Sequence, residues 1–223
     1  MGEVRPGAAT VCCVNRPYRA RRLRAAVIGA ALLAVLTGCA PAAPPSPPAP
    51  AYTPVDPAVV LQARKEAGIP GCPKSSDTVP ARADGLPDLT LDCLGGDSTV
   101  RLAGLRGKPM VINLWAQWCP PCREEAPWLR EFAGKAKGKV LLLGLNYTDG
   151  RPDLAVEFAS LVRWKFPQLA DPGGRLSEHM PVRGLPLTLF VNADGAVVHQ
   201  VVGKLQSYEE LVGLTRDKLG VKL

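Results

Sequence analysis

Apolar and polar positions along the chain predict alternating strands and helices in its second half. An apolar run at 110–115, interrupted only by Asn113, is typical of a strand buried on both faces. The segment 123–133 follows with helical spacing and with acidic residues near its first turn. This order predicts a buried strand that leads directly into a helix.

The later segments continue the alternation. We expect a buried strand at 140–145 and a helix at 153–165. Two strands at 187–191 and 196–202 are joined by a turn at Asp194-Gly195, and a closing helix at 207–219 begins at Ser207. Glu210 completes a capping box with Ser207. The pattern predicts an α/β fold with a central mixed sheet flanked by helices.

Composition limits the number of domains. The chain has 223 residues, of which 47% are hydrophobic, enough for one globular domain plus additional sequence. Eight of the 23 prolines fall within residues 40–57, which indicates a linker.

The positive charge belongs mostly to the first residues. The net charge is +7, but six of the 27 Lys and Arg and only one of the 20 acids, Glu3, precede residue 39. Subtracting six bases and one acid leaves +2. We therefore expect no nucleic-acid partner.

The N-terminus has the organisation of an export signal. Arginines at 16–24 precede an apolar stretch at 25–36, which is shorter than the roughly 20 residues that span a bilayer. Leu36-Thr37-Gly38-Cys39 then resembles a bacterial lipoprotein cleavage site. This predicts a lipoprotein signal peptide over 1–38 and a lipid on Cys39, with an ordinary secretory signal as the alternative.

The remaining sequence divides into three parts. Residues 39–57 contain the lipidated Cys and a Pro/Ala-rich linker, which predicts a semi-rigid spacer or, alternatively, a ligand for a proline-binding partner. We expect an N-terminal extension at 58–84 and the folded domain at 85–223.

Four of the seven cysteines remain once the leader and Cys39 are set aside. Cys119 and Cys122 are three residues apart, which leaves Cys72 and Cys93 for each other. We interpret the second pair as a structural disulfide that ties the segment before the domain to its first strand. A second redox-active pair or a metal site is the alternative; a zinc site would need closer spacing and more ligands.

The sequence Cys119-Pro120-Pro121-Cys122 falls where the central strand turns into a helix. A helix N-terminus stabilises a thiolate and lowers the thiol pKa. The spacing allows Cys122 to close a small disulfide ring over one turn. Cys119 could therefore attack a substrate disulfide, and Cys122 could resolve the mixed disulfide.

The run from Trp115 to Pro127, WAQWCPPCREEAP, resembles the TlpA/ResA branch of thioredoxin-like proteins. The resemblance extends from about Leu86 to the C-terminus. It implies a thioredoxin-like fold and a thiol–disulfide oxidoreductase on the extracytoplasmic face of the bacterial cell membrane. No cofactor or metal is implied beyond the redox-active Cys119–Cys122 pair.

The resemblance also implies roles for single residues. Pro186 matches the cis-proline that lies against the active-site cysteines, and the backbone of Leu185 would pair with an extended substrate segment. Trp118 would form an apolar surface beside Cys119.

Glu125 matches a functional glutamate of these proteins, and we expect it to help deprotonate Cys122. A solvated acid on the first helical turn is the alternative. Thioredoxin has a buried aspartate six residues before its first active-site Cys, and this chain has Asn113 there.

The two prolines of the motif favour a reductase. Pro120 and Pro121 lack the N–H groups that could stabilise the Cys119 thiolate, and a poorly stabilised reduced form gives a low potential. The resemblance implies disulfide-containing extracytoplasmic substrates such as apocytochrome c, with electrons from a membrane thiol transporter. Disulfide formation in secreted proteins is the alternative.

Other classes fit less well. A peroxiredoxin would carry Thr or Ser at Ala116 and Pro at Ile112. A copper-delivery protein of this fold would need cysteines four apart and a histidine ligand, and His179 and His199 are more typical of surface or packing residues. A binding module with a purely structural Cys119–Cys122 pair is the non-enzymatic alternative.

Overall fold

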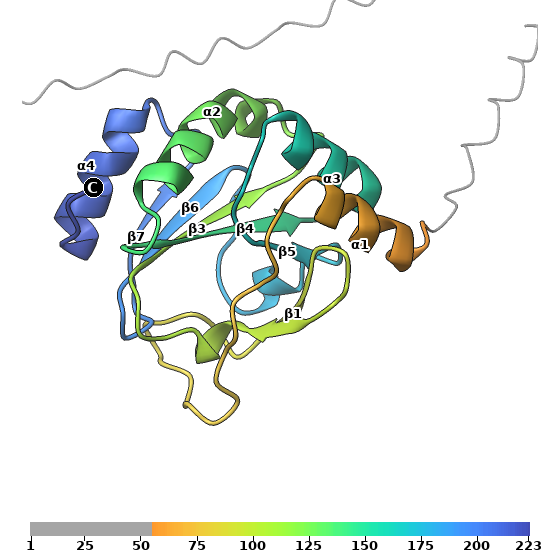
Figure 1. The fold of residues 1–223 in the computed structure, drawn as a ribbon. Helices are drawn as coiled ribbons and strands as arrows, with labels where there is room; N and C mark the ends of the chain where they lie inside the picture. The colour runs from red at the N-terminus through yellow and green to blue at the C-terminus, as the bar shows by residue number, and fades with distance from the viewer. Residues whose placement is uncertain (1–54) are drawn as a thin grey trace, which may run out of the picture. The chain divides into compact units, whose positions relative to one another are not determined.

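A computed structural model describes residues 55–223, which form a seven-stranded mixed sheet (Figure 1). The strand order is β2-β1-β5-β4-β3-β6-β7, with bounds β1 (Thr90–Cys93), β2 (Thr99–Arg101), β3 (Met110–Trp115), β4 (Leu141–Tyr147), β5 (Gln168–Asp171), β6 (Leu187–Val191) and β7 (Val197–Val202). The three central strands β3, β4 and β5 are parallel, and the strands outside them are antiparallel. The predicted central mixed sheet is confirmed.

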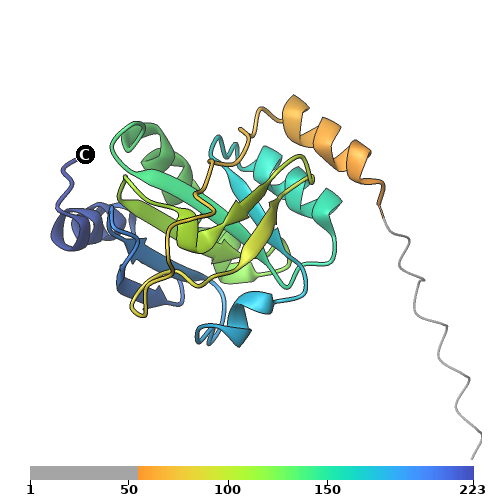
Figure 2. The ribbon, with the colours of Figure 1, turned by 90° about the horizontal axis from the view of Figure 1, so that it is seen from below.

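Four α-helices and two 3₁₀-helices flank the sheet (Figures 1 and 2). Their bounds are α1 (Pro57–Glu66), α2 (Pro120–Lys135), α3 (Pro152–Leu161), α4 (Tyr208–Leu219), η1 (Leu102–Gly104) and η2 (Arg175–Glu178). Helix α2 connects β3 to β4, and α3 connects β4 to β5, so both parallel connections contain a helix, as parallel strands require.

The sheet separates two apolar cores of different construction. Side chains of β3 alternate between them: Val111 and Trp115 lie in one core, and Ile112 in the other. Buried residues of all four α-helices belong to the first core. The second core is closed by η1, η2 and residues 86–91. One face of the sheet is therefore covered by α-helices and the other largely by short or irregular segments.

Helix α1 attaches the extension to the helical face. Asp56 caps it by accepting a hydrogen bond from the Ala58 amide, and Pro57 occupies the first helical position, where its missing N–H costs nothing. Val60 is 2% exposed and belongs to the same core as α2 and α3. The extension thus contributes to the core of the domain.

Two helices differ at their ends from the prediction. Helix α2 begins at Pro120 because the two prolines are tolerated in a first turn, whose N–H groups have no helical partner. Helix α3 ends at Leu161 instead of residue 165. There Arg163 takes a positive φ of 59°, and the Trp164 amide folds back to the Ala159 carbonyl at 2.9 Å.

A buried amide links β5 to the end of β3. The Gln168 side chain crosses β4 at Gly144, where a Cβ would lie only 1.8 Å from the Gln168 Oε1 atom. This oxygen accepts a hydrogen bond from the Trp115 indole at 2.9 Å. Trp115 also packs against Phe158 and Trp164. The strand that leads to the CPPC motif is thereby fixed at its last residue.

The C-terminal hairpin and the helix cap follow the predicted chemistry, except that the Glu210 carboxylate of the expected capping box accepts from the Gln206 amide at 2.5 Å and not from Ser207. Asn192 Oδ1 accepts hydrogen bonds from the Asp194 and Ala196 amides, and Gly195 takes a φ of 81° in the turn between β6 and β7. Ser207 caps α4 by accepting from the Glu210 amide at 3.1 Å.

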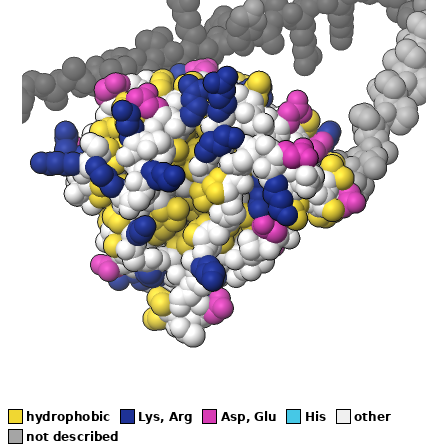
Figure 3. Space-filling view, viewed as in Figure 1, with side chains coloured by type: hydrophobic (Ala, Val, Ile, Leu, Met, Phe, Trp, Pro, Cys, Tyr) yellow, Lys and Arg dark blue, Asp and Glu magenta, His cyan; other side chains and the backbone are white. Residues whose placement is uncertain are grey.

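The leader, Cys39 and most of the proline-rich linker lie outside the described residues. Between residues 55 and 223, no helix is long and apolar enough to cross a membrane. On the face seen in Figure 3, Lys and Arg side chains are spread among apolar and acidic ones and do not form a continuous stripe.

Candidate active site

Cys119 lies at the junction of the central strand and α2. It is the N-cap of the helix, four residues after the last residue of β3. Strand β3 is held between β4 and β6 and is buried along its whole length. A rigid strand and a helix N-terminus therefore fix the position of this sulfur.

Cys119 and Cys122 form a disulfide across the first turn of α2. Both residues are buried, with 2% and 0% of their surface exposed. The Cys122 amide donates a hydrogen bond to Cys119 Sγ at 3.3 Å. Pro120 and Pro121 have no N–H, so Cys122 supplies the first amide of the helix that can reach this sulfur.

A cis peptide bond precedes β6 beside this junction. The Leu185–Pro186 bond is cis, and Pro186 is buried while Leu185 is half-buried. Leu187, the next residue, pairs with Leu114 near the end of β3, so the cis-proline lies at the same end of the sheet as Cys119. Within residues 55–223 the Leu185 backbone has no hydrogen-bond partner.

Glu125 lies one helical turn after Cys122 and is completely buried. Its Oε1 accepts a hydrogen bond from Asn113 Nδ2 at 2.8 Å, and its Oε2 accepts from the Leu205 amide at 3.0 Å. Burial raises the pKa of Glu125 to about 7, against the opposing effects of these hydrogen bonds and of the Lys204 charge. The group can therefore exchange a proton at neutral pH.

Asn113 and Glu125 belong to one buried polar group. Asn113 Nδ2 also lies 3.1 Å from Thr188 Oγ1 on β6, while its Oδ1 has no partner among the described residues. Sequence reasoning treated Asn113 only as a departure from thioredoxin and overlooked Thr188. A signal was present, because a polar residue inside an otherwise apolar strand needs a buried partner.

The loop before Cys119 is fixed by a carboxylate that sequence reasoning missed. Asp149 is 3% exposed, and its Oδ2 accepts hydrogen bonds from the Gln117 amide at 2.9 Å and from Asn146 at 3.0 Å. Arg123 donates to the Gln117 carbonyl at 2.7 Å and lies over the Phe158 ring. Both backbone polar groups of Gln117, in the middle of this loop, are therefore held.

The two tryptophans of the motif have different environments. Trp118 is 53% exposed next to Cys119, whereas Trp115 is fully buried in the core. The exposed Trp118 indole thus presents apolar surface next to Cys119 in the sequence.

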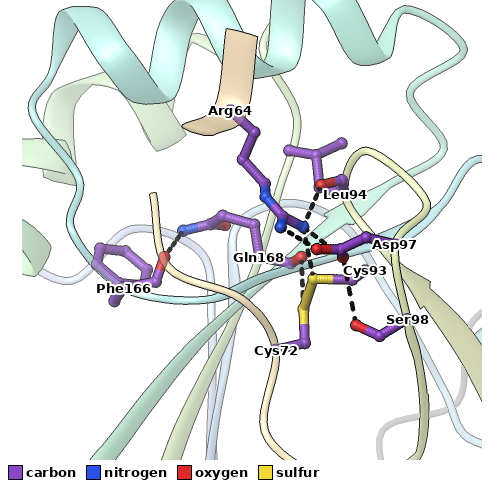
Figure 4. Close-up of a disulfide and its surroundings, with 8 residues drawn as sticks. All are labelled: Arg64, Cys72, Cys93, Leu94, Asp97, Ser98, Phe166 and Gln168. Atoms are coloured by element: carbon purple, nitrogen blue, oxygen red, sulfur yellow. Dashed lines mark hydrogen bonds and ion pairs between the residues drawn. A yellow bond between two sulfur atoms is a disulfide. The ribbon is translucent and has the colours of Figure 1, made fainter. Parts of the chain in front are cut away.

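Cys72 and Cys93 form a second disulfide, between the segment after α1 and the end of β1 (Figure 4). Cys93 pairs with Leu169 of β5, and the Cys72 sulfur lies 3.2 Å from the Gln168 carbonyl oxygen. This disulfide thus joins the extension to the sheet at β1, which β5 and β4 separate from β3.

Residues 55–223 contain no cluster of three or more His, Cys, Asp or Glu side chains that could hold a metal ion. His199 packs against Phe190, with ring centroids 5.8 Å apart, and His179 is exposed.

A family model described as Redoxin matches residues 81–212. The chain belongs to the Redoxin family. It is 36% identical over 149 residues to the thiol:disulfide interchange protein DsbE of Pseudomonas fluorescens biotype C, covering 65% of this chain and 78% of that relative. It is 34% identical over 129 residues to the thiol-disulfide oxidoreductase ResA of Bacillus anthracis, covering 57% of this chain and 72% of the relative.

A solved structure of a secreted Mycobacterium tuberculosis disulfide oxidoreductase, homologous to Escherichia coli DsbE, is similar with a TM-score of 0.51. It is 30% identical and covers 56% of this chain and 92% of that one. Together these findings confirm the predicted thioredoxin-like fold. This Redoxin-family protein is a thiol–disulfide oxidoreductase of the DsbE and ResA type.

Proposed function

We propose that this Redoxin-family protein is a lipid-anchored reductase of protein disulfides on the extracytoplasmic face of a bacterial membrane, acting through Cys119 and Cys122. The observation that carries the reducing direction is the hydrogen bonding of Cys119. Its sulfur accepts from the Cys122 amide, while two prolines occupy the preceding helical positions.

A thiolate at Cys119 has modest stabilisation in this environment. The nearby cation Arg123 is engaged by the Gln117 carbonyl and the Phe158 ring. Glu124 and the buried Glu125 add negative charge on the same helical turn when ionised. Because a weakly stabilised thiolate favours the oxidised enzyme, the reduced enzyme donates electrons readily.

The catalytic cycle follows from this geometry. The Cys119 thiolate attacks one sulfur of the substrate disulfide, and the other substrate sulfur leaves as a thiolate that takes up a proton. Glu125 accepts the Cys122 proton, and the Cys122 thiolate attacks Cys119 Sγ. The second substrate sulfur is released, the substrate has gained two electrons, and Cys119–Cys122 is oxidised.

The surface around Cys119 suits an extended protein segment. The Leu185 backbone can add the segment as a short strand, Pro186 positions it against the cysteines, and Trp118 covers its apolar side. Because the Cys119–Cys122 disulfide is itself buried, a substrate has to approach Cys119 Sγ across the surface formed by Trp118, Leu185 and Pro186.

Apocytochrome c before haem attachment is the substrate class that the TlpA/ResA resemblance favours. Its haem-attachment motif has two cysteines separated by two residues, a disulfide that a dithiol can open. A membrane thiol-electron transporter would then reduce Cys119–Cys122 again.

Reduction of such a disulfide tests the substrate. The reduced full chain should open the disulfide of an apocytochrome c within minutes and become oxidised at Cys119–Cys122 in equal amount. A Cys119→Ser variant is the control. Failure to reduce apocytochrome c by a chain that reduces other protein disulfides would reject this substrate class.

The reduction potential tests the direction. The full chain is equilibrated in dithiothreitol buffers, alkylated and analysed peptide by peptide, so that each cysteine pair is measured separately. We expect Cys119–Cys122 at about −270 mV or lower, near thioredoxin. A value near −120 mV would reject the reductase and favour disulfide formation in secreted proteins.

Membrane attachment depends on Cys39. The wild-type chain, expressed in bacteria with its leader, should partition with the membrane and carry lipid, and the Cys39→Ser variant should carry none. A wild-type chain recovered without lipid after cleavage would reject the anchor while leaving the redox chemistry intact.

A further inference from the structure

An arginine side chain is buried directly against the second disulfide. Arg64 of α1 is 2% exposed, and its guanidinium donates to Cys93 Sγ at 3.1 Å and to the Leu94 carbonyl at 3.0 Å (Figure 4). It also binds both carboxylate oxygens of Asp97. Its Nε atom has no partner among the described residues.

Arg64 makes one weak contact and several strong ones. Burying a guanidinium carries a large desolvation penalty, which Asp97 and the Leu94 carbonyl offset, whereas the disulfide sulfur is a weak acceptor that adds little. A thiolate at the same position would accept a charge-assisted hydrogen bond from Arg64, about twice as strong as a neutral one. The site is therefore better matched to the reduced Cys93 than to the oxidised one.

The two sulfurs differ in access. Cys93 is 1% exposed at the end of β1, whereas Cys72 is half-buried in the segment after α1. An incoming thiolate must approach along the S–S axis, so it reaches Cys72 first and expels Cys93. Exchange therefore has what it needs: Cys72 is the accessible sulfur, and Cys93, next to Arg64, is the stabilised leaving group.

We propose that Cys72–Cys93 is a second reactive disulfide, opened by dithiols through attack at Cys72 with Cys93 as the leaving thiolate on Arg64. One reductant thiolate bonds to Cys72 Sγ, the Cys72–Cys93 bond breaks, and Cys93 keeps the electron pair. The second reductant thiolate then attacks the mixed disulfide and releases Cys72, which takes up a proton. The reductant becomes a disulfide, and the protein gains two electrons.

Opening this pair removes the covalent link between the segment after α1 and β1. Val60 of α1 and Ile69 of that segment remain packed in the first core, so the domain stays folded. The proposal is independent of the proposed direction of Cys119–Cys122, since the two pairs are measured as separate peptides.

Two variants of the Arg64–Asp97 ion pair provide the test, one that removes the positive charge and one that removes the negative charge. The full chain is equilibrated with dithiothreitol of graded redox ratio at pH 7, and each pair is quantified by alkylation and peptide mass spectrometry. Arg64→Gln should disfavour reduction of Cys72–Cys93 by at least about tenfold, equivalent to about 30 mV for two electrons. Asp97→Asn should favour reduction by a similar factor, since it removes the competing anion.

Controls separate a charge effect from a loss of structure. Arg216→Gln removes an exposed arginine of α4 that binds Asp217, and it should leave the equilibrium unchanged. Cys119–Cys122 should not shift in any of these variants. If Arg64→Gln does not fold, the test rests on Asp97→Asn, in which the Cys72–Cys93 equilibrium should shift toward the reduced form. The proposal is overturned if the wild-type pair stays closed until the protein unfolds, or if Asp97→Asn has no effect.

Discussion

The two disulfides of the described domain lie against the same sheet but in different electrostatic surroundings. At Cys119–Cys122, one amide approaches the first sulfur and the nearby buried ionisable group is an acid, Glu125. At Cys72–Cys93, the charged group that donates to a sulfur is the buried cation Arg64, which is also paired with Asp97. The sequence motif marks the first pair as reactive, yet the charge beside the second favours a thiolate more strongly.

The difference shows that the size of the disulfide ring and the charge beside it have separate effects on how readily each disulfide opens. A three-residue separation makes Cys119–Cys122 a compact ring that opens and closes without moving the fold, whereas 21 residues separate Cys72 from Cys93. In the folded chain, the packing of α1 and of the segment after it keeps Cys72 beside Cys93 and opposes opening of the longer ring, whereas Arg64 favours opening. The following variants act on one of these factors at a time.

Removing the attacking sulfur has the largest effect. Cys119→Ser should lower disulfide reductase activity by at least about a thousandfold, because the nucleophile is lost. A Cys72→Ser/Cys93→Ser double variant should keep activity within about threefold, since it leaves the CPPC helix intact. Insulin reduction measures both, and equal losses in the two variants would contradict the separation of roles.

Glu125→Gln should slow resolution of the mixed disulfide by about a hundredfold, since the proton acceptor for Cys122 is lost. Stopped-flow kinetics of mixed-disulfide decay measures this step. In the wild-type protein the rate should rise with pH through about 7, the pKa of Glu125. A Glu124→Gln variant, changed at an exposed acid one residue earlier, should retain this rise and is the matched control.

The same buried acid makes stability depend on pH. The folded pKa of about 7 lies above the usual 4.5, so the neutral form is favoured by folding. This contribution is fully present below pH 4.5 and is lost as the pH rises to about 7, a change of about 3 kcal/mol in the free energy of unfolding. Urea titrations at pH 4.5 and 8 should show it in the wild type, and Glu125→Gln should lack it.

Removing the long ring should weaken the fold. The Cys72→Ser/Cys93→Ser variant should lose about 3 kcal/mol of unfolding free energy, the value expected for a loop of this length. Urea unfolding of the variant and the oxidised wild type measures the difference. An unchanged midpoint and slope would show that the ring contributes nothing to stability.

A change inside the short ring should have the smallest effect. Pro121→His restores an N–H and adds an imidazole beside Cys119, so the reduced form should gain stability. We expect the reduction equilibrium of Cys119–Cys122 to shift about tenfold toward the dithiol, or about 30 mV, with Cys72–Cys93 unchanged. No shift would remove the physical basis for assigning the reducing direction to the two prolines.

Local patterns were sufficient to predict most of the domain. The apolar run of β3, the Asp194-Gly195 turn and the Ser207 cap each depend on neighbouring residues, and the structure contains all three. The end of α3 was wrong by four residues because Arg163 adopts a left-handed conformation that its residue type rarely takes. Strand β5 was not predicted, since its four residues show no clear period.

The site was predictable only where one motif contained it. Cys119, Cys122 and Glu125 fall within seven residues and were identified together. Thr188 and Asp149 were missed, because their partners are 75 and 32 residues away along the chain. Arg64 was missed for the same reason, since α1 meets Cys93 only in the folded chain.

The connectivity of the two disulfides has a consequence for oxidative folding. In the described domain each cysteine is joined to the next along the sequence, Cys72 to Cys93 and Cys119 to Cys122. Four cysteines can pair in three ways. A chain that crosses a membrane N-terminus first would expose Cys72 and Cys93 before the other two, so simple oxidation in order of emergence gives the native pairs without an isomerase.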